Sequence, residues 1–234
     1  MVTVSRDWIT RVWEAETGQP VGDKIKYNYK VYSAELSPSG NKVITASQDT
    51  ISQVWSVEDG EKSKGFMKHN SDVLKAKFSP DGTRVVTVSA DKSSRIWDVQ
   101  TSEPIGEPME HSSSVISAEF STDGKRVDTV SADKTARVWD AETGKPIGEP
   151  MTHSSHVNSA IFSIDGTQVI TVSADNTVRV WNVYWSAISR SDDLVREVCK
   201  SKLREDASVI TKGDISAIST LLENRIGEDV CEGY

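Results

Sequence analysis

Five tryptophans recur at a fixed interval of 42 residues along this chain. They are Trp13, Trp55, Trp97, Trp139 and Trp181. Alignment on these residues brings other segments into register, such as Phe-Ser-x-Asp-Gly at 78–82 and 120–124. A repeat of this length predicts a tandem array of one small structural unit, because each unit buries its apolar faces only against its neighbours.

Residues 115–151 show what one unit contains. Runs rich in β-branched residues alternate there with turns, at Thr122-Asp123-Gly124 and Asp133-Lys134. The predicted strands are 115–121, 127–132, 135–140 and 146–151. Prolines flank the last run, which suits an outer edge strand with an incomplete ladder. Four short strands in each unit predict an all-β array.

A small residue recurs midway along the first predicted strand of each of four units. These residues are Ala34, Ala76, Ala118 and Ala160. Inner strands of radially stacked sheets crowd toward a common axis, where a small side chain is needed. The array is therefore predicted to be a β-propeller whose four-stranded sheets, or blades, pack face to face.

Over about residues 1–183 these features resemble the WD40-repeat family, whose Trp-Asp dipeptide stands at 97–98 and 139–140. The resemblance implies a buried hydrogen-bond network in each blade. Its members are a His before the first strand, a Ser or Thr on the second, an Asp in the next turn and the Trp on the third. The matching residues are His69, Thr87, Asp91 and Trp97; His111, Thr129, Asp133 and Trp139; His153, Thr171, Asp175 and Trp181; and, with Tyr27 at the His position, Thr45, Asp49 and Trp55.

Elementary chemistry explains why such a network would be kept. A buried carboxylate is costly unless it is hydrogen-bonded. A chain of indole N–H, hydroxyl, imidazole and carboxylate satisfies every member and favours one packing of the blade. We therefore predict that these residues, including three of the four histidines, are structural.

The array is predicted to be incomplete. About five blades are expected, the first without its inner strand, because Met1 falls where a second strand begins. The last blade lacks its outer strand, and a short α-helical C-terminal tail follows, with Leu194, Val198 and Leu203 on one helix face. The predicted domains are the blades, 1–183, and the tail, 184–234. Three explanations stay open: missing N-terminal blades, an arc completed by another chain or by strand-completing self-association, and a self-closed ring.

Asp128 breaks the repeat pattern, because other blades carry Ile44, Val86 or Ile170 at this position. A buried, unpaired carboxylate costs on the order of several kcal/mol or stays protonated. Arg126 is the expected partner if the strand is exposed. Together with the missing strand, Asp128 leaves open the alternative that the chain is a decayed, non-functional fragment.

Composition narrows the class of protein. The formal net charge of −8 argues against binding to nucleic acid. The sequence contains neither an apolar run long enough to span a membrane nor a signal peptide, so a cytoplasmic location is expected. Cys199 and Cys231, both in the tail, are expected to be thiols, although a bridge between them stays open.

The sequence offers few candidates for catalytic, cofactor-binding or metal-binding residues. His153 and His156 have a spacing that suits a metal, but two ligands are too few and His153 belongs to the network. Each apparent Ser-His-Asp set is the structural network, and neither a Gly-x-Ser-x-Gly turn nor a phosphate-binding loop is present. We predict no catalytic residue, cofactor or metal.

Loops before the first strands, together with a tyrosine cluster, are the best candidates for contacts with a partner. The candidate partner-binding residues are Tyr27, Tyr29, Tyr32, Asn70, Asp72, Ser113 and His156. For Tyr27 there is an equal alternative, in which it replaces the network histidine and does not bind a partner. The tail also looks similar to endings found after bacterial WD40 arrays. We therefore expect a non-catalytic protein–protein interaction scaffold, the recognition segment of a larger bacterial signalling or regulatory protein. The alternative is the C-terminal portion of a multidomain enzyme or NTPase sensor with its catalytic domain upstream of Met1.

Overall fold

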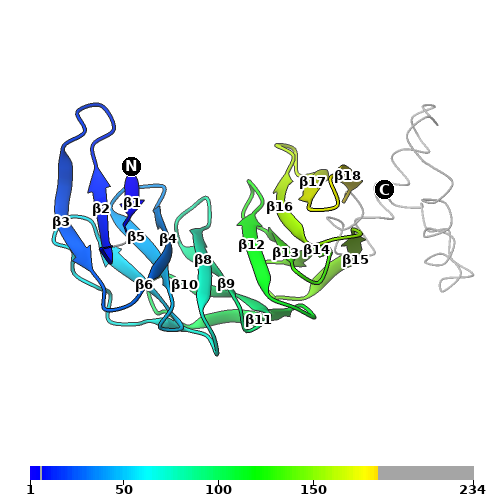
Figure 1. The fold of residues 1–234 in the computed structure, drawn as a ribbon, viewed down its shortest axis with the longest axis horizontal. Helices are drawn as coiled ribbons and strands as arrows, with labels where there is room; N and C mark the ends of the chain where they lie inside the picture. The colour runs from blue at the N-terminus through cyan, green and yellow to red at the C-terminus, as the bar shows by residue number, and fades with distance from the viewer. Residues whose placement is uncertain (6, 184–234) are drawn as a thin grey trace, which may run out of the picture. The chain divides into compact units, whose positions relative to one another are not determined.

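The computed structural model describes residues 1–5 and 7–183, and the regular secondary structure of these residues consists of β-strands (Figure 1). In chain order they are β1 (Val2–Val4), β2 (Ile9–Trp13), β3 (Pro20–Lys26), β4 (Val31–Leu36), β5 (Lys42–Ser47), β6 (Ile51–Ser56), β7 (Met67–Lys68), β8 (Val73–Phe78), β9 (Arg84–Ser89), β10 (Ser93–Asp98), β11 (Pro104–Glu110), β12 (Val115–Phe120), β13 (Arg126–Ser131), β14 (Thr135–Asp140), β15 (Pro146–Thr152), β16 (Val157–Phe162), β17 (Gln168–Ser173) and β18 (Val178–Asn182). These strands belong to the first of two compact units, Met1–Tyr184. The predicted tail helices lie outside the described residues, and within the described ones no helix could cross a bilayer.

The strands form antiparallel sheets in which neighbours in sequence are neighbours in space. Three sheets have four strands each: β4 to β7, β8 to β11 and β12 to β15. In the described part of the chain, the first sheet contains β1 to β3 and the last contains β16 to β18. The predicted all-β class and four-stranded antiparallel units are thereby confirmed.

Tight turns join the strands in the way that the repeat predicts. In the turn between β12 and β13, the Asp123 carboxylate accepts hydrogen bonds from the Ser121 hydroxyl (2.6 Å) and from the Lys125 backbone N–H (3.0 Å). Gly124 follows with a φ of 68°, a conformation that glycine adopts without a steric penalty. From the sheet before, Arg84 donates to the Gly124 carbonyl (2.6 Å). The turn therefore both reverses the chain and ties two sheets together.

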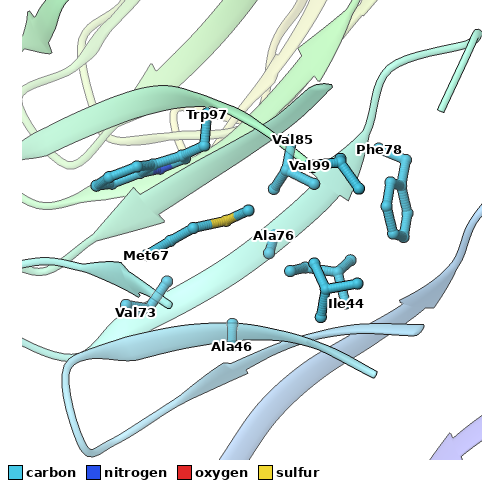
Figure 2. Close-up of a cluster of buried hydrophobic side chains, with 10 residues drawn as sticks. Ile44, Ala46, Met67, Val73, Ala76, Phe78, Val85, Trp97 and Val99 are labelled. Carbon is cyan, nitrogen blue, oxygen red and sulfur yellow. The ribbon is translucent and has the colours of Figure 1, made fainter. Parts of the chain in front are cut away.

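Apolar cores lie between consecutive sheets (Figure 2). In one of them, Ile44 and Ala46 on β5 face Ala76 on β8, and Val85 and Trp97 belong to the same cluster. We call the side of a sheet that meets the next sheet in the chain its forward face, and the opposite, tryptophan-bearing side its backward face. Two further clusters repeat this arrangement, between the third and fourth sheets and between the fourth and fifth. The predicted alanines at 76, 118 and 160 are all buried in these cores.

Asp128 is the exception on the forward face of the fourth sheet. It is only 1% exposed, and its Oδ2 atom has no hydrogen-bond partner among the described residues. The expected partner, Arg126, instead donates to the Gly166 carbonyl (2.8 Å) and lies over the Phe162 ring. Burial raises the pKa of Asp128 well above its ordinary value, and the Glu119 carboxylate opposite it adds to the rise. The strand is buried rather than exposed, so the predicted rescue by Arg126 does not occur.

Candidate interaction surface

The side-chain network of the third sheet connects four residues from four different segments. The Trp97 indole N–H donates to the Thr87 hydroxyl (2.8 Å), which also lies 2.6 Å from His69 Nε2. His69 Nδ1 lies 3.0 Å from the Asp91 carboxylate. Trp97, Thr87 and His69 are all buried. The network therefore connects the core between the sheets to the turn that carries Asp91.

The chemistry of the network assigns each proton. Burial lowers the pKa of His69 and of His111, so both imidazoles are neutral near pH 7. An ionised carboxylate only accepts, so His69 Nδ1–H donates to Asp91 and leaves Nε2 as an acceptor. The Thr87 hydroxyl then donates to Nε2 while it accepts from Trp97. Both ring nitrogens of His69 therefore have a partner, and neither is free for a ligand.

The fourth and fifth sheets repeat this geometry. His111 lies 2.8 Å from Asp133 and 2.7 Å from Thr129, which accepts from Trp139 at 2.7 Å. In the fifth sheet the corresponding distances, for His153, Asp175, Thr171 and Trp181, are 3.0, 2.7 and 2.8 Å. The residues that the family resemblance assigns to the network are thus brought together in all three sheets.

The network aspartates also hold the loops that precede the first strands. Asp91 accepts from the Asn70 backbone N–H (2.9 Å) and from the N–H and hydroxyl of Ser93. Burial opposes ionisation of Asp91, but these hydrogen bonds outweigh it and hold its pKa at about 2. Asp133 and Asp175 accept in the same way from the backbone N–H groups of Ser112 and Ser154, each at 3.0 Å. Each loop is therefore fixed by a charged acceptor.

A second set of hydrogen bonds fixes the other end of each loop. The Ser89 hydroxyl donates to the Asp72 carbonyl (2.9 Å), and Ser131 donates to the Ser114 carbonyl (3.0 Å). Ser173 donates to the His156 carbonyl (3.0 Å). These loops have a fixed backbone, while Asn70 and His156 remain exposed and Ser113 half-buried.

The second sheet builds its network with a tyrosine. The Tyr27 hydroxyl contacts the Thr45 hydroxyl, which accepts from the Trp55 indole (2.9 Å). The Tyr27 and Trp55 rings meet edge to face with centroids 5.0 Å apart, and burial raises the pKa of Tyr27. The Asp49 carboxylate accepts from the Ile51 backbone N–H (3.1 Å). Tyr27 thus occupies the histidine position of the network.

Replacing Tyr27 with phenylalanine removes only the hydroxyl that contacts Thr45. We expect the free energy of unfolding to fall by about 1 kcal/mol, the usual net contribution of one hydrogen bond. Tyr29→Phe is the matched control, because Tyr29 is 54% exposed. Urea unfolding of both variants measures the difference, and an equal loss in both would contradict the placement of Tyr27 in the network.

Tyr32 lies at the junction of the second and third sheets. Its hydroxyl donates to the Asp72 carboxylate (2.6 Å), and Lys30 Nζ lies 4.6 Å from the ring centroid. We call the set Tyr29, Tyr32, Asn70, Asp72, Ser113 and His156 the loop rim. Two predicted partner-binding side chains, Tyr32 and Asp72, are thereby joined across two sheets. Partner binding at the loop rim stays a prediction.

The described residues contain no group of three or more His, Cys, Asp or Glu placed to hold a metal ion. The network carboxylates are engaged with backbone N–H groups, and His156 Nδ1 is 3.5 Å from the Ser155 hydroxyl. In the part of the chain that the structure describes, these network groups serve packing and hydrogen bonding.

A groove on the second sheet was missed by the sequence analysis. It has a volume of about 800 Å³, and Val21, Val54, Trp55, Val57 and Val99 are among its lining residues. None of the loop-rim residues lines it. The groove forms where β7 is reduced to two residues. Lys62-Ser-Lys-Gly stands there instead of the Pro-Ile-Gly-Glu found at 104–107 and 146–149, a departure visible in the sequence.

The family model described as "WD domain, G-beta repeat" matches residues 60–98, 102–140 and 144–182. The comparison with curated proteins gives no match. Among solved structures, the chain is similar to the crystal structure of the computationally designed Ika8 protein, with a TM-score of 0.69 and 25% sequence identity. That alignment covers 78% of this chain and 55% of the other, so the chain spans about half the length of the designed protein.

Proposed function

The chain belongs to the WD40-repeat family, and from that premise we propose that it is a non-catalytic scaffold that binds other proteins through the loop rim. Repeats of this family generally mediate protein–protein interaction. The fold by itself does not define the partner, so the proposal depends on the surface.

One observation carries this proposal: the backbone of the rim loops is fixed while the side chains of Tyr29, Asn70 and His156 are exposed. Asp91, Asp133 and Asp175 each hold the loop that precedes a first strand. Binding to a surface that is already ordered avoids the entropic cost of ordering it. A rim of this kind is suited to present side chains to a partner in one arrangement.

Tyr29 and His156 are the rim residues most suited to anchor a partner. Tyr29 is an exposed aromatic residue, and aromatic residues are enriched among those that dominate binding energy. The exposed imidazole of His156 offers both a donor and an acceptor. They lie before the second and fifth sheets, so a partner that contacts both covers a broad part of the rim.

The test compares variants against a partner first identified by affinity capture and then purified. We expect the Tyr29→Ala/His156→Ala double variant to raise the Kd at least about tenfold, a loss of about 1.4 kcal/mol. Glu107→Ala/Glu149→Ala, on the exposed outer strands β11 and β15, is the control and should leave the Kd within about twofold. Calorimetry measures the Kd of each variant. Weaker binding in the Glu107→Ala/Glu149→Ala control alone would place the interface elsewhere.

We further propose that the chain is the recognition segment of a larger bacterial signalling or regulatory protein in the cytoplasm. The net charge of −8 and the absence of cysteine before residue 199 support a protein of a reducing compartment that does not bind nucleic acid. Fractionation of cells that express the tagged full gene product tests the location. Recovery from the membrane or the medium would contradict it.

A further inference from the structure

The forward face of the last sheet carries an exposed apolar surface. Ile161 on β16 is 54% exposed, Val172 on β17 is 41% exposed, and Val178 and Val180 on β18 are 65% and 59% exposed. The strand register shows that these residues share one side of the sheet, because Val172 is opposite Val178, and Ile170 is opposite both Ile161 and Val180. The patch is therefore continuous across all three strands.

At the positions of Val172 and Val180, the corresponding surface is covered on the second, third and fourth sheets. Val180 corresponds to Val138, Ile96 and Val54 at intervals of 42 residues, and all three are buried. Val172 corresponds in the same way to the buried Val130, Val88 and Ala46. In each case the cover is the backward face of the following sheet. The partner that fits this patch is therefore the backward face of a sheet of the same kind.

The chain also exposes a backward face, on its first sheet. The Trp13 indole donates to the Thr3 hydroxyl (2.7 Å), as Trp97 does to Thr87. Trp13 is half-buried, as Trp55 and Trp181 are, whereas Trp97 and Trp139 are buried. Met1 is exposed at the repeat position of Val43, Val85 and Val127, which are all fully buried. Both halves of an interface that the chain makes internally are thus present on its surface.

We propose that this protein associates head to tail, with the forward face of the last sheet of one copy covered by the backward face of the first sheet of a second copy. The interface continues the sheet-to-sheet contact that recurs within the chain. Contiguous exposed apolar patches of this kind mark association sites. Two different surfaces meet, so the contact is heterologous, and it closes into a ring or extends into a filament. The proposal is independent of partner binding at the loop rim.

Light scattering coupled to gel filtration tests the proposal on the full chain. We expect a mass that is a multiple of the 25.7 kDa chain and falls on dilution. Val180→Glu should give monomers that keep the wild-type circular dichroism spectrum, and Val178→Glu is a second variant on the same face. Ile164→Glu is the matched control, because Ile164 is 92% exposed in a turn outside the patch. A wild-type monomer at all concentrations, or an oligomer unchanged in both patch variants, would overturn the proposal.

Mixing tests which surface covers the patch. A Val180→Glu copy keeps its first sheet intact, so it should bind the forward face at the end of a filament, or the forward face that a wild-type copy exposes when it leaves a ring. In both cases it should block further growth and lower the mass of the oligomer. Association of two forward faces with each other predicts no mixed species, since the variant has lost that face. Failure of a labelled Val180→Glu protein to join the wild-type protein would therefore overturn the head-to-tail arrangement.

Discussion

Replacing Asp128 with valine is expected to raise the free energy of unfolding by about 2–4 kcal/mol at neutral pH. Asp128 is fully buried on the forward face of β13, with one carboxyl oxygen unpaired and Glu119 opposite it. Valine is the residue at the same position of β9, where it is buried in the core. Urea unfolding of both proteins at pH 7 gives the difference.

The dependence on pH identifies the cause of that gain. The folded pKa of Asp128 is raised above the unfolded value of 3.8, so folding disfavours the ionised form. The penalty is absent below pH 3.8 and grows as the pH rises toward the folded pKa, because the unfolded chain ionises first. The advantage of Asp128→Val should grow over the same window. Asp128→Asn, which cannot ionise, should lose this pH dependence, and a gain equal at pH 4 and pH 7 would exclude ionisation as the cause.

Thr129→Val is expected to lower the free energy of unfolding by about 2–5 kcal/mol. The Thr129 hydroxyl accepts from the Trp139 indole and donates to His111 Nε2, and all three residues are buried. Valine has nearly the same shape as threonine, so the change leaves two buried polar atoms unpaired without opening a large cavity. Each unpaired buried group costs about 1–3 kcal/mol.

Thr171→Val removes the same hydrogen bonds in the last sheet and is the matched control. Trp181 is only half-buried there, so water can replace part of what the indole loses. We expect a smaller loss than for Thr129→Val. Equal losses at the two sites, or a loss below about 1 kcal/mol at Thr129, would contradict the role of the hydroxyl as the centre of a buried network.

The repeat made much of the fold predictable. A constant interval of 42 residues places every network member at a fixed strand position, so one recognised blade predicts the others. The role of Tyr27 could not be assigned from the sequence, because a tyrosine close to Tyr29 and Tyr32 is equally well interpreted as a binding residue. In the structure its hydroxyl contacts the Thr45 hydroxyl, as the histidines of the other sheets contact their threonines.

Other features depend on three-dimensional context that the repeat does not encode. The sequence marks Asp128 as unusual, but only the burial of β13 and the contact of Arg126 with Gly166 show that it lacks a partner. On the exposed forward face of β16 to β18, Val172 and Val180 are of the same residue type as Val130 and Val138, which are buried. The repeat pattern at these two positions therefore does not predict their exposure. The groove beside β7 follows from a local loss of the outer-strand pattern.

Hydrogen exchange measured by NMR tests most directly whether the network holds the loops of the rim rigid. Asn70, Ser112 and Ser154 are exposed, yet their backbone N–H groups donate to Asp91, Asp133 and Asp175. We predict that these three amides exchange at least about 100-fold more slowly than in an unfolded chain. Exchange at unprotected rates, while the amides of β9 and β13 stay protected, would show that the rim is mobile and would contradict the account.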